Sequence, residues 1–205
     1  MSAAGDLEAI RAALAGREPG DLVDPFAPSA PVRPASGLVP VYEDGGDAHV
    51  LFVRRSDHLG KHAGQIAFPG GGREPGEDEL TCALREAEEE VGIRQPGVEI
   101  LGRLDRYTTI TGYLVSPFVA KLDWPCELRP DPGEVAQILH VPIARLVEPG
   151  TLRVADGQRG VVNFFDVGDE VIWGATARML RQLLELELGR PLIPSGPVPW
   201  DKVRW

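Results

Sequence analysis

Residues 70–93 read GGGREPGEDELTCALREAEEEVGI and combine three glycines, a turn and a glutamate-rich helix. Asp78 is a suitable N-cap and Gly92 a suitable C′ residue, so the helix is predicted to end at Val91. Its apolar residues recur at steps of three and four, which predicts one buried face. These residues are Leu80, Ala83, Leu84, Ala87 and Val91.

Three glutamates share a neighbouring face of this helix. Glu86, Glu89 and Glu90 stand at i, i+3 and i+4, a spacing at which like charges repel and weaken an isolated helix. A solvated acidic face is the usual form of such a run. The upstream glycines, however, allow backbone carbonyls to approach the carboxylates closely. Oxygen ligands without His or Cys suit Mg²⁺ or Mn²⁺, so the pattern predicts a site for one of these cations.

The spacing of the fixed residues resembles the Nudix box. That box reads Gly, five residues, Glu, seven residues, Arg-Glu, an apolar residue, any residue, Glu-Glu, any residue, Gly and an apolar residue. The matching positions are Gly71, Glu77, Arg85, Glu86, Ala87, Glu89, Glu90, Gly92 and Ile93. Ala87 is smaller than the Ile, Leu or Val usual in the family. A match over so many spaced positions is a specific signal.

The resemblance implies a role for each residue of the box. It assigns metal binding to Glu86, Glu89, Glu90 and the carbonyl of Gly71. Arg85 is expected to orient the carboxylates, Glu77 to be its ion-pair partner, and Gly92 to end the helix. The family's reaction is attack by water on a diphosphate linked to another group. Divalent cations favour it because they neutralise the phosphate charge and lower the pKa of bound water.

The residues before the box resemble the coenzyme A pyrophosphatase branch of the family. Arg55-Ser56, Gly64 and Phe68-Pro69-Gly70-Gly71 match its upstream pattern, but Gly60 stands where the branch has an inner arginine. This replacement removes five hydrogen-bond donors and adds loop freedom. Shorter matches follow downstream, at Thr111-Gly112-Tyr113, Ser116-Pro117-Phe118 and Trp173-Gly174-Ala175-Thr176-Ala177. The resemblance implies that coenzyme A or acyl-coenzyme A is split into adenosine 3′,5′-bisphosphate and phosphopantetheine.

Four cationic residues just upstream are candidates for phosphate binding. They are Arg54, Arg55, Lys61 and His62. Guanidinium groups bind phosphate bidentately. For each residue the alternative is an exposed charge that serves solubility. Strand alternation sends neighbouring side chains to opposite faces, so at most one of Arg54 and Arg55 is expected to face the site.

Two further features leave alternatives open. Glu134 opens a predicted strand after a proline-rich loop, and in Nudix enzymes an acid from a later loop often joins the metals or serves as the base. Its alternative is a surface glutamate at a strand edge. Trp173 and Tyr113 are candidates for stacking on adenine, although an aromatic residue at the head of an amphipathic helix more often belongs to the core.

Composition limits the class of protein and its partners. The 205 residues include 21 basic and 31 acidic side chains, a net charge of −10, which argues against non-specific binding of nucleic acid or anionic membranes. A small anionic substrate is compatible with this charge, because bound cations reverse the local field. Cys82 and Cys126 form neither a disulfide framework nor a metal motif. Without a signal or membrane-spanning segment, a cytoplasmic location is expected.

The predicted organisation is one α/β domain with tails. Residues 1–36 are expected to form a helix (Asp6 to Ala15) and an extended proline-rich connector, residues 37–190 the Nudix domain, and residues 191–205 a tail. The tail either folds back or pairs two copies in a homodimer. Mixed strands with one helix in mid-chain and one near the end indicate a helix–sheet–helix sandwich, and the resemblance implies the Nudix-type α/β/α sandwich with a mixed sheet. The expected strands are Leu38 to Tyr42, His49 to Arg54, Gln65 to Phe68, Val98 to Leu104, Tyr113 to Leu122, Glu134 to Leu139, Thr151 to Ala155 and Val161 to Val167. The first two are expected to form a hairpin around Glu43 to Ala48 and the last two a second hairpin, and the last helix is Trp173 to Leu188.

The box indicates the chemistry but not the group attached to the diphosphate. The leading hypothesis is a Mg²⁺- or Mn²⁺-dependent diphosphatase acting on coenzyme A or acyl-coenzyme A. A second keeps the chemistry and changes the small-molecule substrate to ADP-ribose, NADH, a nucleotide sugar or a nucleoside triphosphate. A third is a non-catalytic Nudix domain that senses a nucleotide. All three acidic residues of the box are present, which favours the two enzymatic hypotheses.

Overall fold

A mixed sheet lies between two layers of helices in the computed structural model, which describes residues 7–24, 27–60, 62–157 and 160–196. Within these residues the larger sheet has nine strands. They are β1 (Asp21–Val23), β2 (Arg33–Asp44), β3 (Asp47–Arg55), β4 (Ile66–Ala67), β5 (Gly70–Gly72), β6 (Val98–Arg103), β7 (Arg106–Thr108), β8 (Tyr113–Leu122) and β9 (Val135–Pro142). A smaller sheet contains β10 (Leu152–Gly157), β11 (Gly160–Val167) and β12 (Glu170–Trp173), and the helices are α1 (Leu7–Leu14), α2 (Glu79–Val91), α3 (Ile143–Leu146) and α4 (Gly174–Leu188).

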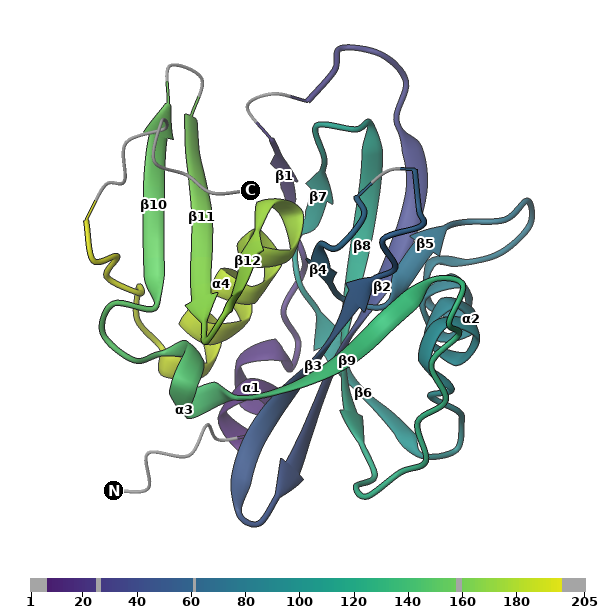
Figure 1. Cartoon of the computed structure of the whole chain (residues 1–205), viewed down its shortest axis with the longest axis horizontal. Helices are drawn as coiled ribbons and strands as arrows, with labels where there is room; N and C mark the ends of the chain where they lie inside the picture. Colours follow the sequence, from purple (N-terminus) through teal and green to yellow (C-terminus); the bar gives the residue numbers. More distant parts are fainter. Residues whose placement is uncertain (1–6, 25–26, 61, 158–159, 197–205) are drawn as a thin grey trace.

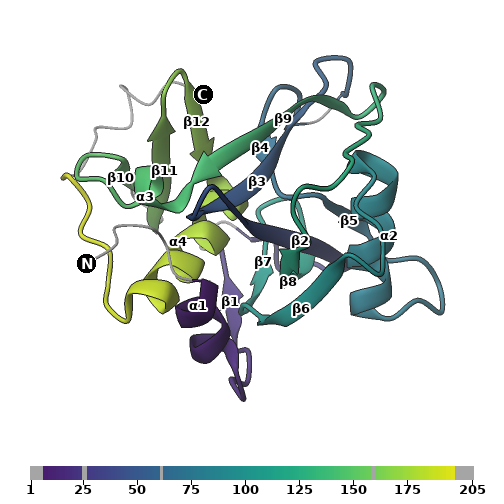
Figure 2. The same cartoon turned by 90° about the horizontal axis from the view of Figure 1, so that it is seen from below.

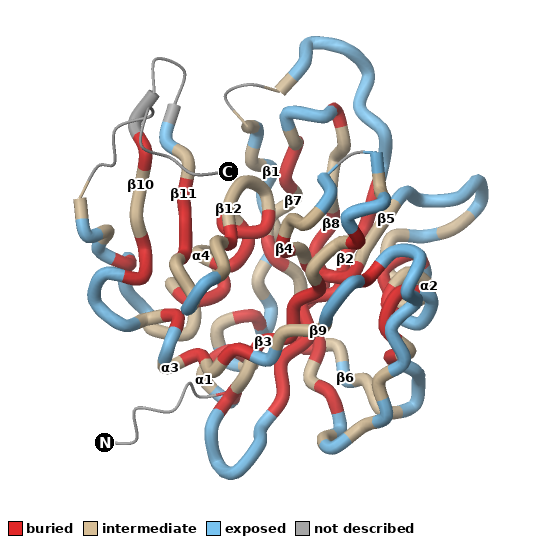
Figure 3. The backbone as a smooth tube through the Cα atoms, viewed as in Figure 1, coloured by how far each residue is buried: buried red, intermediate tan, exposed pale blue. Residues whose placement is uncertain are grey.

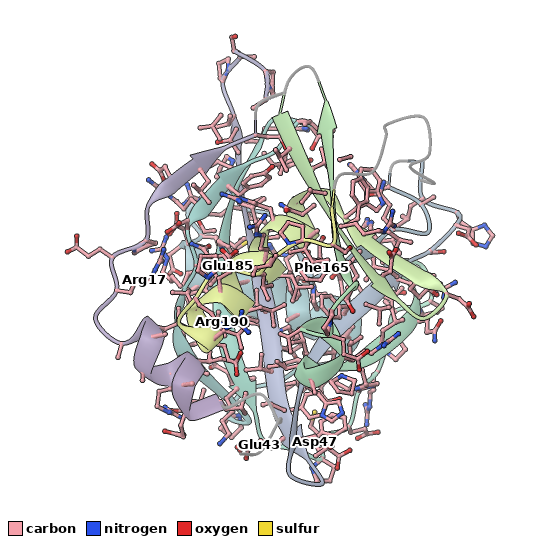
Figure 4. The ribbon with its side chains drawn as sticks, turned by 90° about the vertical axis from the view of Figure 1, so that its left-hand side faces the viewer. Arg17, Glu43, Asp47, Phe165, Glu185 and Arg190 are labelled. Carbon is pink, nitrogen blue, oxygen red and sulfur yellow. The ribbon has the colours of Figure 1, made fainter. Side chains whose placement is uncertain are left out.

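The centre of the larger sheet is β2, which pairs in parallel with β8 and in antiparallel with β3 (Figure 1). The strand order is β1-β7-β8-β2-β3-β4, with β5 also paired to β2, β6 to β8 and β9 to β3. The predicted hairpin between the second and third strands is confirmed, since Asp44 pairs with Asp47 around Gly45 and Gly46. Figure 4 shows Glu43 and Asp47 at the tip of this hairpin.

Alternation along the strands divides the core between the two helical layers. On β3, Val50 and Phe52 belong to the cluster that includes α1 and α4, whereas Leu51 and Val53 belong to the cluster beneath α2. Figure 2 shows the sheet with α1 and α4 on one side and α2 on the other. Buried backbone follows β2, β3 and β8 in Figure 3. The predicted sandwich with a mixed sheet is therefore confirmed.

Helix α2 has the ends that its sequence predicts. The Asp78 side chain accepts a hydrogen bond from the Thr81 N–H at 2.8 Å, and Gly92 adopts a left-handed conformation with φ 76°. The buried face includes Ala83, Ala87 and Val91, as the apolar spacing predicts. The helix therefore holds its glutamates at fixed positions relative to the sheet.

Several short elements were not predicted. The connector was expected to contain no regular element, but it contains β1 and the first residues of β2, and β1 pairs with the equally unpredicted β7. Strand β12 was also missed and turns the predicted hairpin of β10 and β11 into a three-stranded sheet. Each of these strands has three or four residues, too few for period-two alternation to show.

The two ends of the described chain lie against the domain. The predicted N-terminal helix is confirmed, and its Leu7, Ile10 and Leu14 are buried in the same core as α4. In the tail, Ser195 donates hydrogen bonds from its N–H and hydroxyl to the Leu152 carbonyl, so residues 191–196 fold back onto β10. Residues 197–205 lie outside the described chain. No described helix has the length and apolar character that a membrane crossing requires.

Candidate active site

The glycine turn and α2 meet at the acidic face. Strand β5 pairs with β2 through Gly71 and Ser36, which places the turn beside the helix. A Cβ on Gly71 would lie 2.4 Å from the Glu86 carboxylate, so only glycine fits there without moving that side chain. The Gly70 N–H donates to Oε2 of Glu90 at 3.0 Å. The glycine turn therefore lies against the carboxylates, through an N–H at Gly70, while the approach of the Gly71 carbonyl to them stays a prediction.

Arg85 connects the acidic residues of the box. Its Nε and Nη2 donate to the two carboxylate oxygens of Glu77, at 2.9 and 3.0 Å, which is the predicted ion pair in bidentate geometry. Its Nη1 donates to Glu86 at 2.9 Å and to Glu89 at 3.0 Å. Arg85 therefore offsets the repulsion between glutamates that the helical spacing creates.

Glu90 is the most buried of the three glutamates. Its side chain is 3% exposed, and burial raises its pKa from 4.5 to about 7, against the opposing effects of the Gly70 N–H and the Arg55 guanidinium. Burial also raises the pKa of Glu86. Glu89, in contrast, has a side chain that is 60% exposed. The site therefore concentrates carboxylates whose charged forms need compensating positive charge.

The raised pKa of Glu90 predicts how the metal-free stability depends on pH. A carboxyl group with a higher pKa in the folded state stabilises most below its unfolded pKa, and this contribution is lost as pH rises through about 7. In EDTA, the wild type should therefore lose up to about 3 kcal/mol of unfolding free energy relative to Glu90→Gln between about pH 4.5 and pH 8. Thermal melts of both proteins across this range provide the measurement. Parallel pH profiles would contradict the assignment.

The predicted phosphate-binding cations occupy different places. The Arg55 guanidinium lies 3.5 Å from Glu90, whereas Arg54 pairs with Glu170 of β12 on the other face. The prediction that at most one of them faces the site is confirmed. His62 is exposed and contacts the Gln65 side chain through Nδ1 at 2.8 Å. Lys61 lies outside the described residues.

Glu134 lies immediately before β9, close to the acidic face. Its carbonyl accepts a hydrogen bond from the Ser56 N–H at 2.8 Å, which fixes the loop beside the end of β3. Its negative charge contributes to the raised pKa values of both Glu86 and Glu90. The structure therefore brings Glu134 to the carboxylates, as expected for a functional acid from a later loop.

The donor set of this site fits a divalent cation. It consists of carboxylates, which the Gly71 carbonyl is expected to join, and such oxygen ligands are the ones that Mg²⁺ and Mn²⁺ prefer. In the arrangement described here, no three His, Cys, Asp or Glu side chains among the described residues form a metal-holding group. Arg85 draws Glu86 and Glu89 to its guanidinium, while Glu90 points to the Gly70 N–H. Because Gly71 has no Cβ, the Glu86 carboxylate lies directly against the glycine turn.

A cavity of about 610 Å³ opens beside the glycine turn. Its lining includes Gly70, Gly71 and Gly72, together with residues from β2, β8 and the start of α4. The short downstream matches to the coenzyme A pyrophosphatase branch all contribute to it. They do so through Thr111, Tyr113, Pro117, Trp173, Gly174, Ala175 and Thr176. Segments that are more than 60 residues apart along the chain therefore converge on one cavity.

Several residues of this cavity were not predicted from sequence, among them three with polar side chains. Arg33, Asp24 and Tyr107 line it, from the segment before the expected domain and from the unpredicted β7. The sequence contains no motif at these positions, and only the pairing of β1 with β7 and of β2 with β8 brings them together. Trp173, for which stacking and core packing were both open, ends β12 and lines the cavity.

Comparison with known proteins decides the family. A family model described as a NUDIX domain matches residues 31–161. The chain belongs to the Nudix family. The match covers most of the chain and includes the glycine turn and all of α2.

Curated relatives carry the same family name. A protein of Photorhabdus laumondii named "Uncharacterized Nudix hydrolase NudL" is 40% identical over 141 residues, which cover 66% of this chain and 75% of the relative. An Escherichia coli protein of the same name is 34% identical over 164 residues, 77% of this chain and 83% of the relative. A Nudix hydrolase structure from Nitrosomonas europaea shares the fold, with a TM-score of 0.54, 19% identity and coverage of 84% of this chain and 81% of that one.

This Nudix protein is therefore a hydrolase that acts on a nucleoside diphosphate derivative. Enzymes of the family generally use divalent cations such as Mg²⁺ or Mn²⁺. The box itself does not specify which derivative this Nudix hydrolase cleaves.

Proposed function

We propose that this Nudix hydrolase cleaves the diphosphate of coenzyme A or acyl-coenzyme A, with Mg²⁺ or Mn²⁺, to adenosine 3′,5′-bisphosphate and the phosphopantetheine half. The observation that carries the proposal is the cavity, which adjoins the glycine turn and is lined from all three segments that match the coenzyme A pyrophosphatase branch downstream. Because the three segments line one cavity, their short matches point to one shared binding site. Its volume of about 610 Å³ lies within the range typical of small-molecule sites.

Cation binding is assigned to residues of α2 and the glycine turn. Glu86, Glu89, Glu90 and the Gly71 carbonyl would hold the cations, and Arg85 would set the positions of the first two carboxylates. The bound cations would neutralise the diphosphate and lower the pKa of the attacking water.

The remaining steps involve the substrate and the attacking water. Arg55 faces the buried Glu90 and would bind a phosphate oxygen of the diphosphate. Glu134, which is exposed beside Glu86 and Glu90, would accept a proton from the attacking water. One P–O bond of the anhydride breaks, and water adds across it.

The cavity wall fits the parts of coenzyme A that lie on either side of the diphosphate. Phe68, Val115, Trp173 and Met179 give it an apolar wall, which suits the pantetheine arm or an acyl group. Gly60, in place of the branch's arginine, favours the second candidate, a Nudix diphosphatase for another nucleoside diphosphate derivative. ADP-ribose, NADH, nucleotide sugars and nucleoside triphosphates are the members of this class to compare.

A substrate panel tests the proposal. Purified protein with Mg²⁺ should convert coenzyme A to adenosine 3′,5′-bisphosphate, identified by chromatography, and EDTA should stop the reaction. Fast cleavage of another compound with none of coenzyme A would overturn the coenzyme A assignment in favour of the second candidate. Tight nucleotide binding without cleavage of any compound would instead support a sensing domain.

A further inference from the structure

Arg33 is a cation at the cavity that the box does not include. It opens β2, where its register partner on the parallel strand β8 is Tyr113, and both side chains line the cavity. Ser36, three residues further along β2, pairs with Gly71 of the glycine turn. Three strand residues span about 10 Å, so the Arg33 backbone lies about 10 Å along β2 from the position that pairs with the glycine turn.

Three contacts fix Arg33 on the turn before β8. Its backbone N–H donates to the Gly112 carbonyl at 2.8 Å, and its Nη2 donates to the Thr111 carbonyl at 3.3 Å. Its guanidinium carbon lies 4.1 Å from the centroid of the Tyr113 ring. A guanidinium held over an aromatic ring keeps the N–H groups at its own edge available, where they can bind a phosphate bidentately.

The charge of Arg33 is not used by an ion pair within the described chain. The other cavity arginine, Arg55, lies 3.5 Å from Glu90, whereas no carboxylate of the described residues is within 4.0 Å of the Arg33 guanidinium. The nearby cavity residue Asp24 accepts a hydrogen bond from the Tyr107 hydroxyl. In a protein with a net charge of −10, such a fixed positive group at a cavity indicates an anionic ligand.

We infer that Arg33, stacked on Tyr113 and held by the Thr111-Gly112 turn, binds the 3′-phosphate of a coenzyme A-type substrate. This inference rests on the proposed function. In coenzyme A the 3′-phosphate and the diphosphate lie on the same ribose, so a cation further along β2 on the wall of the same cavity is suited to the 3′-phosphate. Arg33 thereby supplies from β2 a cation in place of the arginine that the branch has at the position of Gly60.

The test compares coenzyme A with 3′-dephospho-coenzyme A. Arg33→Gln should lower kcat/KM for coenzyme A by roughly 10- to 100-fold and change the value for the dephosphorylated compound by less than about threefold. Arg33→Lys should fall between, because lysine keeps the charge but loses the planar fork. Arg145→Gln is the matched control. It removes one positive charge from α3, outside the cavity, and should change neither value.

A binding measurement separates phosphate recognition from turnover. By calorimetry without metal, the wild type should bind adenosine 3′,5′-bisphosphate more tightly than AMP, and Arg33→Gln should abolish this difference. Melting curves establish that each variant is folded. Equal losses for both substrates would place Arg33 on the diphosphate and overturn the inference, as would no loss for either.

The same experiment distinguishes this inference from the proposed function. If the wild type cleaves neither coenzyme A nor its dephosphorylated form, the proposed function fails. Arg33-dependent preference for adenosine 3′,5′-bisphosphate would then still support the phosphate site, whereas equal binding of both nucleotides would overturn it.

Discussion

Glu89→Gln is expected to reduce metal-dependent turnover by at least roughly 10²–10³-fold while leaving the melting temperature of the metal-free protein unchanged. The Glu89 side chain is 60% exposed and, within the described chain, forms its hydrogen bond with Arg85, so an amide in its place fits without disturbing the core. The loss should come from weaker cation binding, because an amide lacks the carboxylate charge. Steady-state kinetics across a Mg²⁺ titration give the measurement.

Glu88→Gln is the matched control for this substitution. Glu88 is the preceding residue of α2, is also exposed, and pairs with Arg94 rather than Arg85. It should retain wild-type turnover and the wild-type Mg²⁺ dependence. Equal activities of the two variants would refute the metal-binding role of Glu89.

Gly71→Ala is expected to reduce turnover by roughly 10²-fold or more with little change in stability. The added Cβ would lie 2.4 Å from the Glu86 carboxylate, which must move away. That carboxylate ends a flexible side chain, so the fold accommodates the change while a proposed cation ligand is displaced. Turnover and melting temperature of the same preparation test both parts.

The neighbouring glycines supply two controls. Gly72→Ala meets no atom within 4 Å and should behave like the wild type. Gly70→Ala places a Cβ 2.5 Å from the Ser36 carbonyl oxygen and 2.7 Å from the Gly37 Cα. Because backbone must move there, this variant should lose about 1–3 kcal/mol of stability. Wild-type turnover of Gly71→Ala would contradict the proposed arrangement. So would losses of activity that parallel the losses of stability across all three variants.

Local signals predicted the parts of the molecule that carry the chemistry. The cap at Asp78, the apolar spacing and the stop at Gly92 define α2, because the energetics of a helix end are set within a few residues. Alternation likewise placed Arg54 and Arg55 on opposite faces of the sheet. These features depend on neighbours in sequence and need no knowledge of the fold.

The features that local signals did not predict depend on pairing between strands that are distant in sequence. Strand β5 consists of three glycines, which have low strand propensity, and it forms because Gly71 aligns with Ser36. Arg33 reaches the cavity only because β2 runs parallel to β8 and aligns with Tyr113. The packing of the whole sheet sets these strand registers, so no local sequence pattern predicts them.

A crystal soaked in Mn²⁺ tests whether the three glutamates of α2 bind a divalent cation. We expect an anomalous peak between the carboxylates of Glu86, Glu89 and Glu90, on the side of the Gly71 carbonyl, with Glu86 and Glu89 turned from Arg85 toward the metal. Carboxylates that stay on Arg85 and the Gly70 N–H, with no manganese between them at a saturating concentration, would contradict it.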